Sequence, residues 1–508
     1  MYPARRFAFV CILCGTIILG ISPVWLPPPA ACRVNESRNA SGAVGLAGAE
    51  VHRQARRDRL AAITGEVFSG SEIRENLRTL CDEIGGRLSG TRNGRQARNL
   101  TERLFNRYGL EQVHQELFAM FGWERGPFRC EIVTPHHVAM HAVSLGNTPS
   151  TPPGGIEAAV VDVGHGNPAE FDDLGHEVRG KFALAVSGAM PGGRWMHRSE
   201  VLAVAAEHAA AGLLYQTRQP GHLPMTGMCW KNEVSPIPGV GISREDGEWI
   251  RRQLERGENV RVRLEMSNLT GEVESANVVA EIPGRSNEYV LVGAHLDAWD
   301  LGQGALDNGT GTMIVLEAAR VLVQIGATPE ATIRFVLFMG EESGLCGSRA
   351  YAAAHADELP ACRAMINCDM TGMPLGIRIM GHEAANGFFE ELLADMHGFE
   401  LTVGISNRAG IYGDHQPFLL AGVPIITPRS RLEDDAWMYY HTSADTFDKV
   451  TFKQLNLAAA FVAALALELA STPERILEHL DGNGVRALIE KNNLGEALSF
   501  WGDWPHEE

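Results

Sequence analysis

The second half of the chain carries histidine and carboxylate residues directly after predicted strands. Residues 288–293 form an apolar run that predicts a buried strand, and this run leads into His295 and Asp297. A histidine is a common metal ligand, and a carboxylate two residues away can hydrogen-bond the ring and fix its tautomer. Alone, the pair is also explained as a surface histidine beside an aspartate.

Asp307 lies in a glycine-rich loop, residues 302–311, that precedes a predicted helix over 311–324. Glycine lets the backbone approach a ligand or an ion closely. The simpler alternative is a helix cap formed by Asp307 or Asn308. The loop therefore predicts either an ion-binding turn or an ordinary helix start.

Two adjacent glutamates, Glu341 and Glu342, follow a predicted strand over 332–338 that is rich in β-branched and aromatic residues. Adjacent carboxylates repel each other unless a cation lies between them or one of them is protonated. With a metal present, one glutamate serves as a ligand while its neighbour acts as a base on bound water. The alternative is a pair of solvated loop acids.

Two further candidates follow later in the chain. Asp369 comes after a predicted strand over 364–368, and His441 lies close to Asp445, a candidate partner for its ring. Because ligands bind at the carboxyl ends of strands in α/β sheets, we expect the metal-binding candidates at one sheet edge. The five potential ligands are His295, Asp307, Glu342, Asp369 and His441.

The chemistry of this set favours a metal centre. One shared carboxylate can bridge two metal ions about 3.5–4 Å apart. Histidine and carboxylate ligands suit zinc with an open catalytic position, and manganese and cobalt are alternatives. The nine cysteines include no pair with zinc-ligand spacing in the body of the chain, so a cysteine zinc site is not expected.

The elements that must position these residues predict an α/β fold with a doubly wound, mostly parallel sheet. Short β-like runs between glycines and prolines predict a smaller, β-rich insert with one or two helices. Ser69 and Glu72 are spaced as a capping box and predict a helix start. The predicted plan is a catalytic domain in two segments, 61–124 and 271–472, an insert at 125–270 and a peripheral C-terminal tail at 473–508.

The N-terminus predicts export. In residues 1–32 a basic pair precedes an apolar run that prolines break, which is typical of a cleaved signal peptide. The run is short for a membrane span, and an uncleaved N-terminal anchor is the alternative. The mature protein is expected to be periplasmic or secreted, without a transmembrane domain, and this setting favours one or more disulfides. Residues 33–60 predict a flexible lead-in.

Composition excludes several classes of protein. The 508 residues contain 44 Lys plus Arg and 62 Asp plus Glu, which gives a formal net charge of −18. This acidic balance argues against a nucleic-acid binder, which shows a basic footprint, and against docking on anionic lipid. The hydrophobic share of 45% and the charged share of 21% are those of a globular protein.

The ordered motifs H-x-D, D in a glycine loop, EE, D and H-T-x-x-D-T resemble the co-catalytic zinc aminopeptidase family. The loop DAWDLGQGALDNGTG and the segment GDHQPFLLAGVP are most similar to its carboxypeptidase Q branch. The resemblance covers residues of about 65–125 and 270–470. Between them, VRGKFALAV, AAEHAAAGLLYQ and IPGVGIS resemble pieces of a protease-associated domain, which that family inserts in the catalytic domain.

The resemblance implies two zinc ions per chain. His295 and Asp369 would hold one ion. Glu342 and His441 would hold the other, and Asp307 would bridge both. This ligand set implies hydrolysis of a peptide bond by a water activated between the two ions.

The resemblance also assigns roles beside the metals. Glu341 would be the general base that acts on the metal-bridging water, and Asp297 would orient the neighbouring metal-binding histidine. Tyr440 or Tyr412 would donate a hydrogen bond to the oxyanion. Both tyrosines are also explained as packing aromatics.

Asp414 and His415 resemble a segment that lines the substrate pocket in relatives, and the alternative is a helix cap with a neighbouring loop histidine. Asn308 departs from the carboxypeptidase Q pattern, which usually has Asp at that position. This departure removes no ligand.

The implied function is a zinc-dependent exopeptidase that hydrolyses short peptides or dipeptides. One alternative is a glutaminyl cyclase, an acyltransferase on the same fold with a single zinc. The other is a receptor-like relative without activity, against which the presence of all five ligands and Glu341 argues. The sequence leaves open the side-chain specificity and the choice between a monomer and a homodimer.

Overall fold

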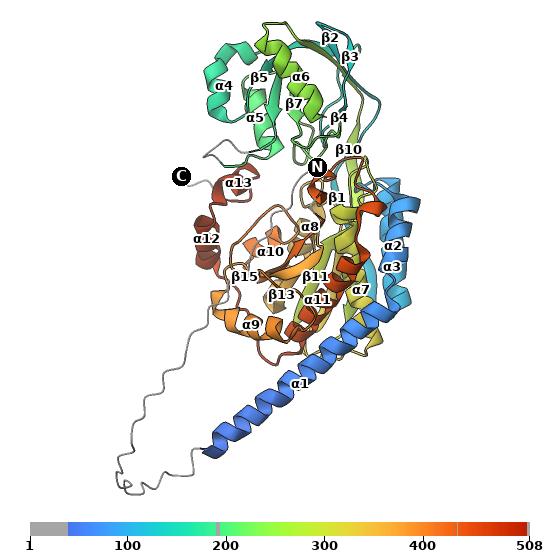
Figure 1. The fold of residues 1–508 in the computed structure, drawn as a ribbon, viewed down its shortest axis with the longest axis vertical. Helices are drawn as coiled ribbons and strands as arrows, with labels where there is room; N and C mark the ends of the chain where they lie inside the picture. Colours follow the sequence, from blue (N-terminus) through green and yellow to red (C-terminus); the bar gives the residue numbers. More distant parts are fainter. Residues whose placement is uncertain (1–38, 189–193, 434, 505–508) are drawn as a thin grey trace, which may run out of the picture. The chain divides into compact units, whose positions relative to one another are not determined.

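A computed structural model describes residues 39–188, 194–433 and 435–504 of the chain. The chain divides into two units, Met1–His52 and Arg53–Glu508. The second unit contains two eight-stranded sheets (Figure 1). The predicted signal peptide, residues 1–32, lies outside the described residues.

The first sheet contains the strands whose ends were expected to carry the site. Its central strands β12, β11, β13 and β16 run parallel, while β10 and β14 are antiparallel to their neighbours β12 and β16. The predicted α/β class is therefore confirmed, with a parallel centre and mixed flanks. In spatial order the strands are β1 (Glu111–Glu124), β10 (Leu269–Ile282), β12 (Thr332–Phe338), β11 (Tyr289–His295), β13 (Cys362–Asn367), β16 (Ile425–Arg431), β14 (Met373–Arg378) and β15 (Gly404–Ser406).

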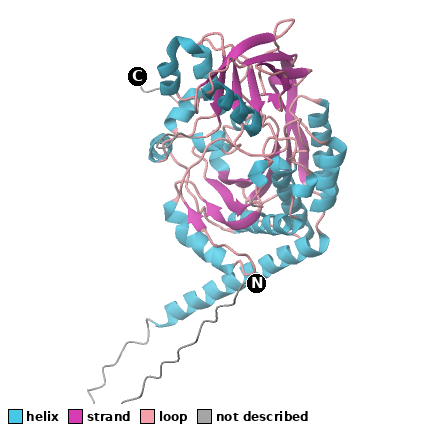
Figure 2. Cartoon of the chain, turned by 45° about the horizontal axis from the view of Figure 1, so that its top comes forward, coloured by secondary structure: helices cyan, strands magenta, loops and turns pink. Residues whose placement is uncertain are grey.

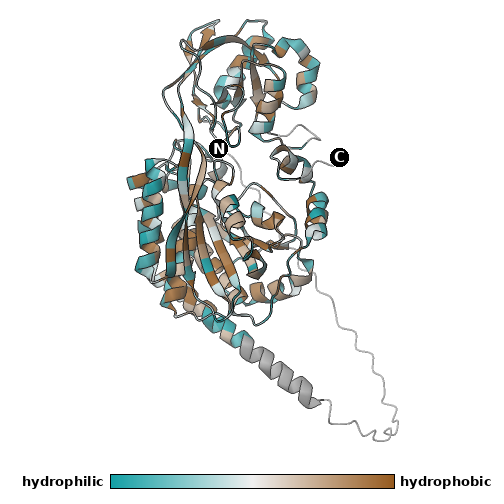
Figure 3. Ribbon diagram, turned by 180° about the vertical axis from the view of Figure 1, so that it is seen from behind, coloured by the Kyte–Doolittle hydropathy of each residue, from teal (hydrophilic) through white to brown (hydrophobic). Residues whose placement is uncertain are grey.

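Helices cover both faces of this sheet (Figure 2). Successive side chains of a strand point to opposite faces, so Val290 and Val292 of β11 pack into one core and Tyr289 and Leu291 into the other. Burial on both faces explains why the central strands are continuous apolar runs, and Figure 3 shows hydrophobic residues concentrated on them. On the first face lie α2 (Ile73–Arg78), α3 (Arg92–Tyr108), α7 (Thr310–Gln324), α9 (Asn386–Asp395) and α11 (Phe452–Ser471); on the second lie α8 (Cys346–Ala354), α10 (Gln416–Leu420), α12 (Gly482–Lys491) and α13 (Gly495–Phe500).

Helix α11 is the one helix of the described chain that is long and apolar enough to cross a membrane by length and composition. In its most apolar window, 78% of the residues are buried inside the molecule. Phe461 and Leu465 of this helix belong to the core of the first face. Its apolar character is thus accounted for by packing against the sheet.

The second sheet is formed by residues between β1 and β10. Its faces are covered by three α-helices rather than the one or two expected, because Ile250 of α6 packs on one face and Phe171 of α4 and Val201 of α5 pack on the other. The helices are α4 (Pro168–Leu174), α5 (Arg198–Glu207) and α6 (Arg244–Glu255). The strands, in spatial order, are β3 (Val138–Ala139), β2 (Phe128–Thr134), β9 (Arg261–Met266), β5 (Ile156–Asp162), β6 (Phe182–Val186), β7 (Gly212–Gln216), β8 (Gly239–Ile242) and β4 (Ala142–Ser144).

The two sheets are joined by β1 and β10, which form an antiparallel ribbon of 14 residues per strand. The register pairs Glu111 with Glu281 at one end and Glu124 with Leu269 at the other. The chain therefore leaves the first sheet on β1 and returns to it on β10. The sequence patterns did not predict this long ribbon.

Two predictions near the N-terminus are wrong. Helix α1 (Asn39–Gly70) includes residues 39–60, which were expected to be a flexible lead-in. Leu60, Ile63 and Val67, in the C-terminal part of this helix, pack into the core. The predicted capping box is also absent, because Ser69 lies near the end of α1 and its hydroxyl donates to the carbonyl of Gly65.

Two further predictions are corrected. The C-terminal tail is not peripheral, since Val485, Leu488 and Ile489 of α12 are buried in the core of the second face. Their i, i+3, i+4 spacing forms one apolar helix face. The expected disulfides are also absent from the described residues, where all six cysteines are free.

Candidate active site

The predicted ligands lie at one edge of the first sheet, at the carboxyl ends of its parallel strands. His295 is the last residue of β11, and Asp307 lies in the short turn Ala305–Gly309 that leads into α7. Glu342 follows β12, and Asp369 follows β13. His441 comes from a loop after β16, in the positive-φ conformation with φ of 55°. Tertiary structure thus brings together all five residues.

The ligand atoms form two groups that share Asp307. In the first, Nε2 of His295 lies 3.3 Å from Oδ1 of Asp307 and 3.4 Å from Oδ1 of Asp369. In the second, Nε2 of His441 lies 3.0 Å from Oδ2 of Asp307 and 3.0 Å from Oε2 of Glu342. The two oxygens of Asp307 therefore face different histidines, as a bridging carboxylate requires.

These separations fit metal coordination. A tetrahedral ion with bonds of about 2.0–2.1 Å holds its ligand atoms about 3.3–3.4 Å apart. In addition, Oε1 of Glu342 and Nδ1 of His441 are buried without a hydrogen-bond partner among the described residues. Carboxylates packed this closely need a cation, because their mutual repulsion is strong in a buried site. The residues present therefore suit a pair of metal ions.

Glu341 directly precedes the ligand Glu342 and interacts electrostatically with His295 and Asp369. Burial, reinforced by the charges of Asp369 and Glu342, raises the pKa of Glu341 well above its ordinary value. A bound dication would oppose this shift, since it favours the ionised carboxylate. A partly buried carboxylate with a raised pKa is suited to accept a proton near neutral pH.

Tyr440 stacks on the imidazole of His441, with ring centroids 3.7 Å apart. Burial, together with the charge of Asp307, raises the pKa of Tyr440 well above its ordinary value. Its hydroxyl therefore stays protonated at neutral pH and remains a hydrogen-bond donor.

Two predicted partner interactions are different in the structure. The ring of His295 is hydrogen-bonded at Nδ1 to the main-chain carbonyl of Asp297, at 3.0 Å, while the Asp297 carboxylate lies at 3.8 Å. That carboxylate instead accepts from the backbone N–H of Glu341 at 3.2 Å. Asp297 thus holds two parts of the site together, one through its carbonyl and one through its side chain.

Asp445, predicted to be a partner of the His441 ring, instead fixes the Asp307 turn. Its two carboxylate oxygens accept from the backbone N–H groups of Leu306, at 2.7 Å, and of Asp307, at 3.1 Å. In the part of the chain that the structure describes, the ring of His441 has no hydrogen bond at Nδ1. Asp445 therefore determines where Asp307 lies and leaves the histidine to its stacking contacts.

The comparisons with known proteins agree with this site. Peptidase family M28 matches residues 277–466 of the chain, the stretch that contains all five ligands. Carboxypeptidase Q of Mus musculus is 33% identical over 416 residues, which cover 79% of this chain and 86% of that protein. The chain belongs to peptidase family M28. It is a metallo-exopeptidase, and the predicted resemblance and enzyme class are confirmed.

A further curated relative and two solved structures are also similar to this M28 peptidase. Carboxypeptidase Q of Homo sapiens is 31% identical, with 79% of this chain and 86% of that protein covered. A crystal structure of a peptidase M28 precursor from Shewanella amazonensis has a TM-score of 0.76 at 27% identity, covering 84% of this chain and 99% of that one. A zinc aminopeptidase from Bacillus subtilis shares the fold, with a TM-score of 0.61 at 23% identity over 81% of this chain and 97% of that one.

Two cavities of this M28 peptidase meet at the ligands. One has a volume of about 310 Å³ and the other about 530 Å³. Both are lined by Glu341, Tyr412, Trp437, Tyr440 and His441, so a molecule that spans them passes over the general-base candidate. The smaller cavity also receives side chains from the second sheet segment, including Arg198 and Lys231.

Two of the three predicted pocket residues line these cavities, and the third does not. Tyr412 lines both cavities, and His415 lines the larger one. Asp414 does not line either cavity. Its side chain is buried, and burial raises its pKa to about 7. Asp414 therefore lies beneath the surface of these two cavities, and its role in the substrate pocket stays a prediction.

Several residues that build the site were missed from the sequence. Arg87, fully buried in a predicted turn, donates to the carbonyls of Leu296 (2.6 Å), Gln303 (2.7 Å) and Gly304 (2.8 Å). Trp299 donates from Nε1 to Oε2 of Glu342 at 2.6 Å. Arg87 gave no sequence signal, because its partners lie about two hundred residues away in the chain.

The contacts of Asn308 give a physical account of its departure from the carboxypeptidase Q pattern. Its Nδ2 donates to the carbonyl of Cys368 at 2.9 Å. Its Oδ1 accepts from the backbone N–H of Gly311 at 2.9 Å and of Met370 at 3.1 Å. An ionised aspartate has no donor for the Cys368 carbonyl, so the amide satisfies all three groups in this M28 peptidase.

Proposed function

We propose that this chain is a dizinc exopeptidase that hydrolyses the peptide bond of short peptides or dipeptides. The observation that carries the proposal is the pair of ligand groups that share Asp307, with Glu341 lining both adjacent cavities. Two cavities of about 310 and 530 Å³ on either side support a small substrate. These volumes are in the range of small-molecule sites rather than of a cleft for a long chain.

Each group of residues would hold one zinc ion. His295 and Asp369 would bind the first, Glu342 and His441 the second, and Asp307 would bridge them. When bound, the ions would lower the pKa of a water molecule and polarise the scissile carbonyl. Histidine and carboxylate ligands with an open position are typical of catalytic zinc.

The remaining chemistry belongs to side chains of this chain. Glu341 would take a proton from the attacking water and return it to the leaving amine nitrogen. Tyr440, whose hydroxyl stays protonated, would donate to the oxygen that becomes negative. Asp297 would hold the backbone of Glu341 in place through a hydrogen bond, and Asp445 would do the same for Asp307.

We infer further that residues 125–270 form a protease-associated domain and that residues 1–32 direct export. The first inference is supported by the second sheet, whose residues lie between β1 and β10. The second rests on the basic pair and apolar run of the sequence alone. Mass spectrometry of the mature N-terminus after expression with the native leader tests the export signal, and an uncleaved chain would contradict it.

The central experiment compares Glu341→Gln with the unchanged protein. The variant should keep about two zinc ions per chain and lose hydrolysis of a panel of dipeptides and aminoacyl amides by about 10²–10⁴-fold. Metal content is measured by atomic emission and hydrolysis by release of free amine. Near-normal turnover in Glu341→Gln would refute the mechanism.

Glu342→Gln serves as the matched comparison. This variant changes the neighbouring glutamate by the same substitution, but it removes a ligand oxygen and should therefore lose zinc as well as activity. Equal zinc retention in both variants would contradict the assignment of Glu342 as a metal ligand and Glu341 as the general base. Cyclisation of a Gln-peptide in place of hydrolysis would instead favour a glutaminyl cyclase.

A further inference from the structure

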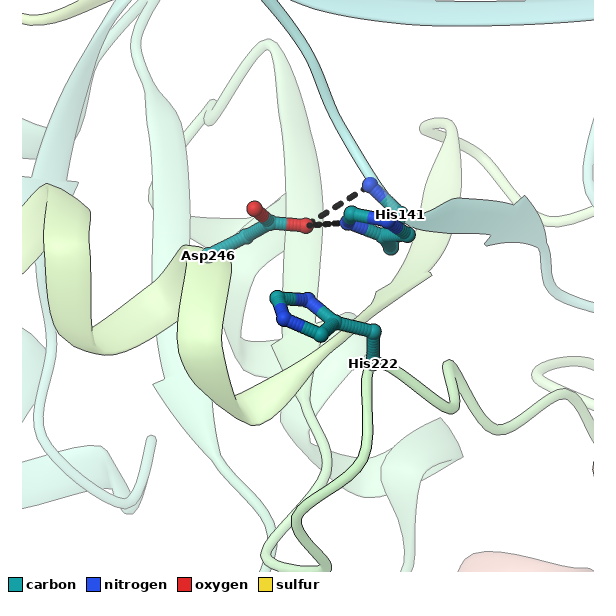
Figure 4. Close-up of side chains that lie close together, drawn as sticks. All are labelled: His141, His222 and Asp246. Carbon is teal, nitrogen blue, oxygen red and sulfur yellow. Dashed lines mark hydrogen bonds and ion pairs between the residues drawn. The ribbon is translucent and has the colours of Figure 1, made fainter.

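A second cluster of metal-binding side chains lies in the second sheet segment, away from both active-site cavities. It consists of His141, His222 and Asp246 (Figure 4). His141 directly precedes β4, His222 lies in the loop after β7, and Asp246 lies in the first turn of α6. One ligand atom from each residue lies within 4.8 Å of the others. Three separate parts of the segment therefore meet at this point.

The distances in the cluster suit coordination. Nδ1 of His141 lies 3.3 Å from Oδ2 of Asp246, about the separation of two ligand atoms on one tetrahedral zinc ion. The rings of His141 and His222 lie 4.3 Å apart at their centroids, with 42° between their planes. The side chains of His141 and His222 are 53% and 52% exposed, so small ring rotations can close the remaining distance.

The backbone holds both histidines in place. Asp246 accepts from the backbone N–H of His141 at 2.7 Å. Glu245 accepts from the backbone N–H groups of Gly221, at 2.7 Å, and of His222, at 3.1 Å. His222 sits at φ of 53°, a conformation that non-glycine residues seldom adopt. Two carboxylates at the start of α6 thus fix the two positions from which the rings converge.

The ring of His222 has no hydrogen bond to any described residue, and its closest charged neighbour is Glu245, at 4.0 Å. Two carboxylates, Asp246 and Glu245, surround the two imidazoles. Their combined charge balances that of a divalent cation. Nδ1 of His141 is hydrogen-bonded to Asp246, its partner in the cluster, while the ring nitrogens of His222 have no hydrogen bond within the described residues and are available as ligands.

We propose that His141, His222 and Asp246 form a third metal site, for zinc or another divalent transition ion. Two imidazoles and one carboxylate are ligands that zinc, copper and nickel accept, whereas calcium and magnesium prefer oxygen alone. The exposure of the two histidines leaves the fourth position to water. The site lies outside the active site and does not depend on the function proposed for that site.

The 217–226 loop that carries His222 also borders the active site. From its first half, Gln219 donates to the carbonyl of Trp437 at 3.3 Å. From its end, the backbone N–H of Thr226 donates to the carbonyl of His441 at 3.0 Å. Arg218, Gln219 and Met225 line the 310 Å³ cavity. A metal ion bound at His222 would therefore order a loop that forms a wall of this cavity.

The test is a zinc titration of the chelator-stripped mature protein, followed by calorimetry and by metal analysis after dialysis. The unchanged protein should bind one zinc ion more than either His141→Ala or His222→Ala. His176→Ala is the matched control, because His176 is an exposed histidine of the same segment outside the cluster. This variant should bind as many ions as the unchanged protein.

Hydrogen exchange gives an independent readout. Zinc should slow exchange of the 217–226 loop in the unchanged protein and in His176→Ala, and not in His222→Ala. Equal zinc numbers in the unchanged protein and both cluster variants would overturn the proposal, as would equal zinc-dependent protection of the loop. Because the comparison is a difference of one ion, it stands whether the active site holds two zinc ions, one or none.

Discussion

Asp445→Asn offers the sharpest check on how the site is built. The Asp445 side chain is 4% exposed, and its two oxygens accept separately from the N–H groups of Leu306 and Asp307. Asparagine keeps one acceptor oxygen and turns the other position into an NH₂ donor. One backbone N–H then faces a donor, and the remaining hydrogen bond loses its charge assistance.

The expected magnitude follows from these two bonds. A hydrogen bond to a charged group contributes about 1.5–3 kcal/mol, and an unsatisfied buried donor costs about 1–3 kcal/mol. Asp307 is then held less firmly between its two histidines. Changes to residues that orient metal ligands typically lower metal affinity or activity about 10–100-fold, and about 1.4–2.7 kcal/mol corresponds to that range.

The assay measures zinc affinity by competition with a chelator and hydrolysis on the same preparations. Asp448→Asn is the control, because Asp448 lies in the same loop but its side chain is 70% exposed and pairs with Lys449. The control should match the unchanged protein in both measurements. If Asp445→Asn also matches it, then Asp445 does not position Asp307 and the reasoning fails.

Three further changes test other parts of the molecule. Ile489→Ala in α12, a fully buried site, should lower the free energy of unfolding by about 2–5 kcal/mol without loss of zinc; a change below about 1 kcal/mol would mean that the tail does not belong to the core. Arg87→Met should cost about 3 kcal/mol or more, because it leaves at least three buried carbonyls without a donor; denaturant unfolding with normal stability would contradict this. Burial raises the pKa of Glu288, but hydrogen bonds from Arg475 and Arg363 outweigh it and hold that pKa below its ordinary value of 4.5. A carboxylate with a lowered folded pKa stabilises above its unfolded pKa, so the melting-temperature difference between the protein and Glu288→Gln should be present at pH 7 and shrink below about pH 4.5; a difference independent of pH would refute it.

The centre of the fold was predictable because its sequence signals are local. The strands at 288–293, 332–338 and 364–368 are continuous apolar runs, since helices bury both of their faces. β10 lacks this signal: its first half is largely exposed, and only residues from Ser275 onwards are buried on the sheet. One half of this strand has the pattern of an exposed ribbon and the other half has the pattern of a buried core strand. The whole strand therefore matches neither the alternating pattern nor the continuous apolar pattern of a strand.

The ligands were predictable for a related reason. They follow the ends of strands, so their order along the chain already indicates one edge of a sheet. Arg87 and Asp445 could not be assigned their roles, because their partners are distant backbone groups, before the Asp307 turn for Arg87 and within it for Asp445. Backbone groups are the same for every residue type, and the sequence therefore gives no sign of which ones need a partner. The tail is a different case, since the i, i+3, i+4 spacing of Val485, Leu488 and Ile489 in α12 is a local signal for a buried helix face.

The β1–β10 ribbon has a consequence for how this enzyme can change over evolutionary time. Glu124 and Leu269 are cross-strand partners, so the segment between them enters and leaves the molecule at a single point. A two-residue turn is sufficient to close such an antiparallel pair. The segment can therefore be removed or replaced without a change in the pairing of β1 with β10. Recombination at this point can replace Arg198 and Lys231 in the cavity wall while the metal-binding edge is inherited unchanged. The residues that bind the metal and those that line the cavity can thus change independently during evolution.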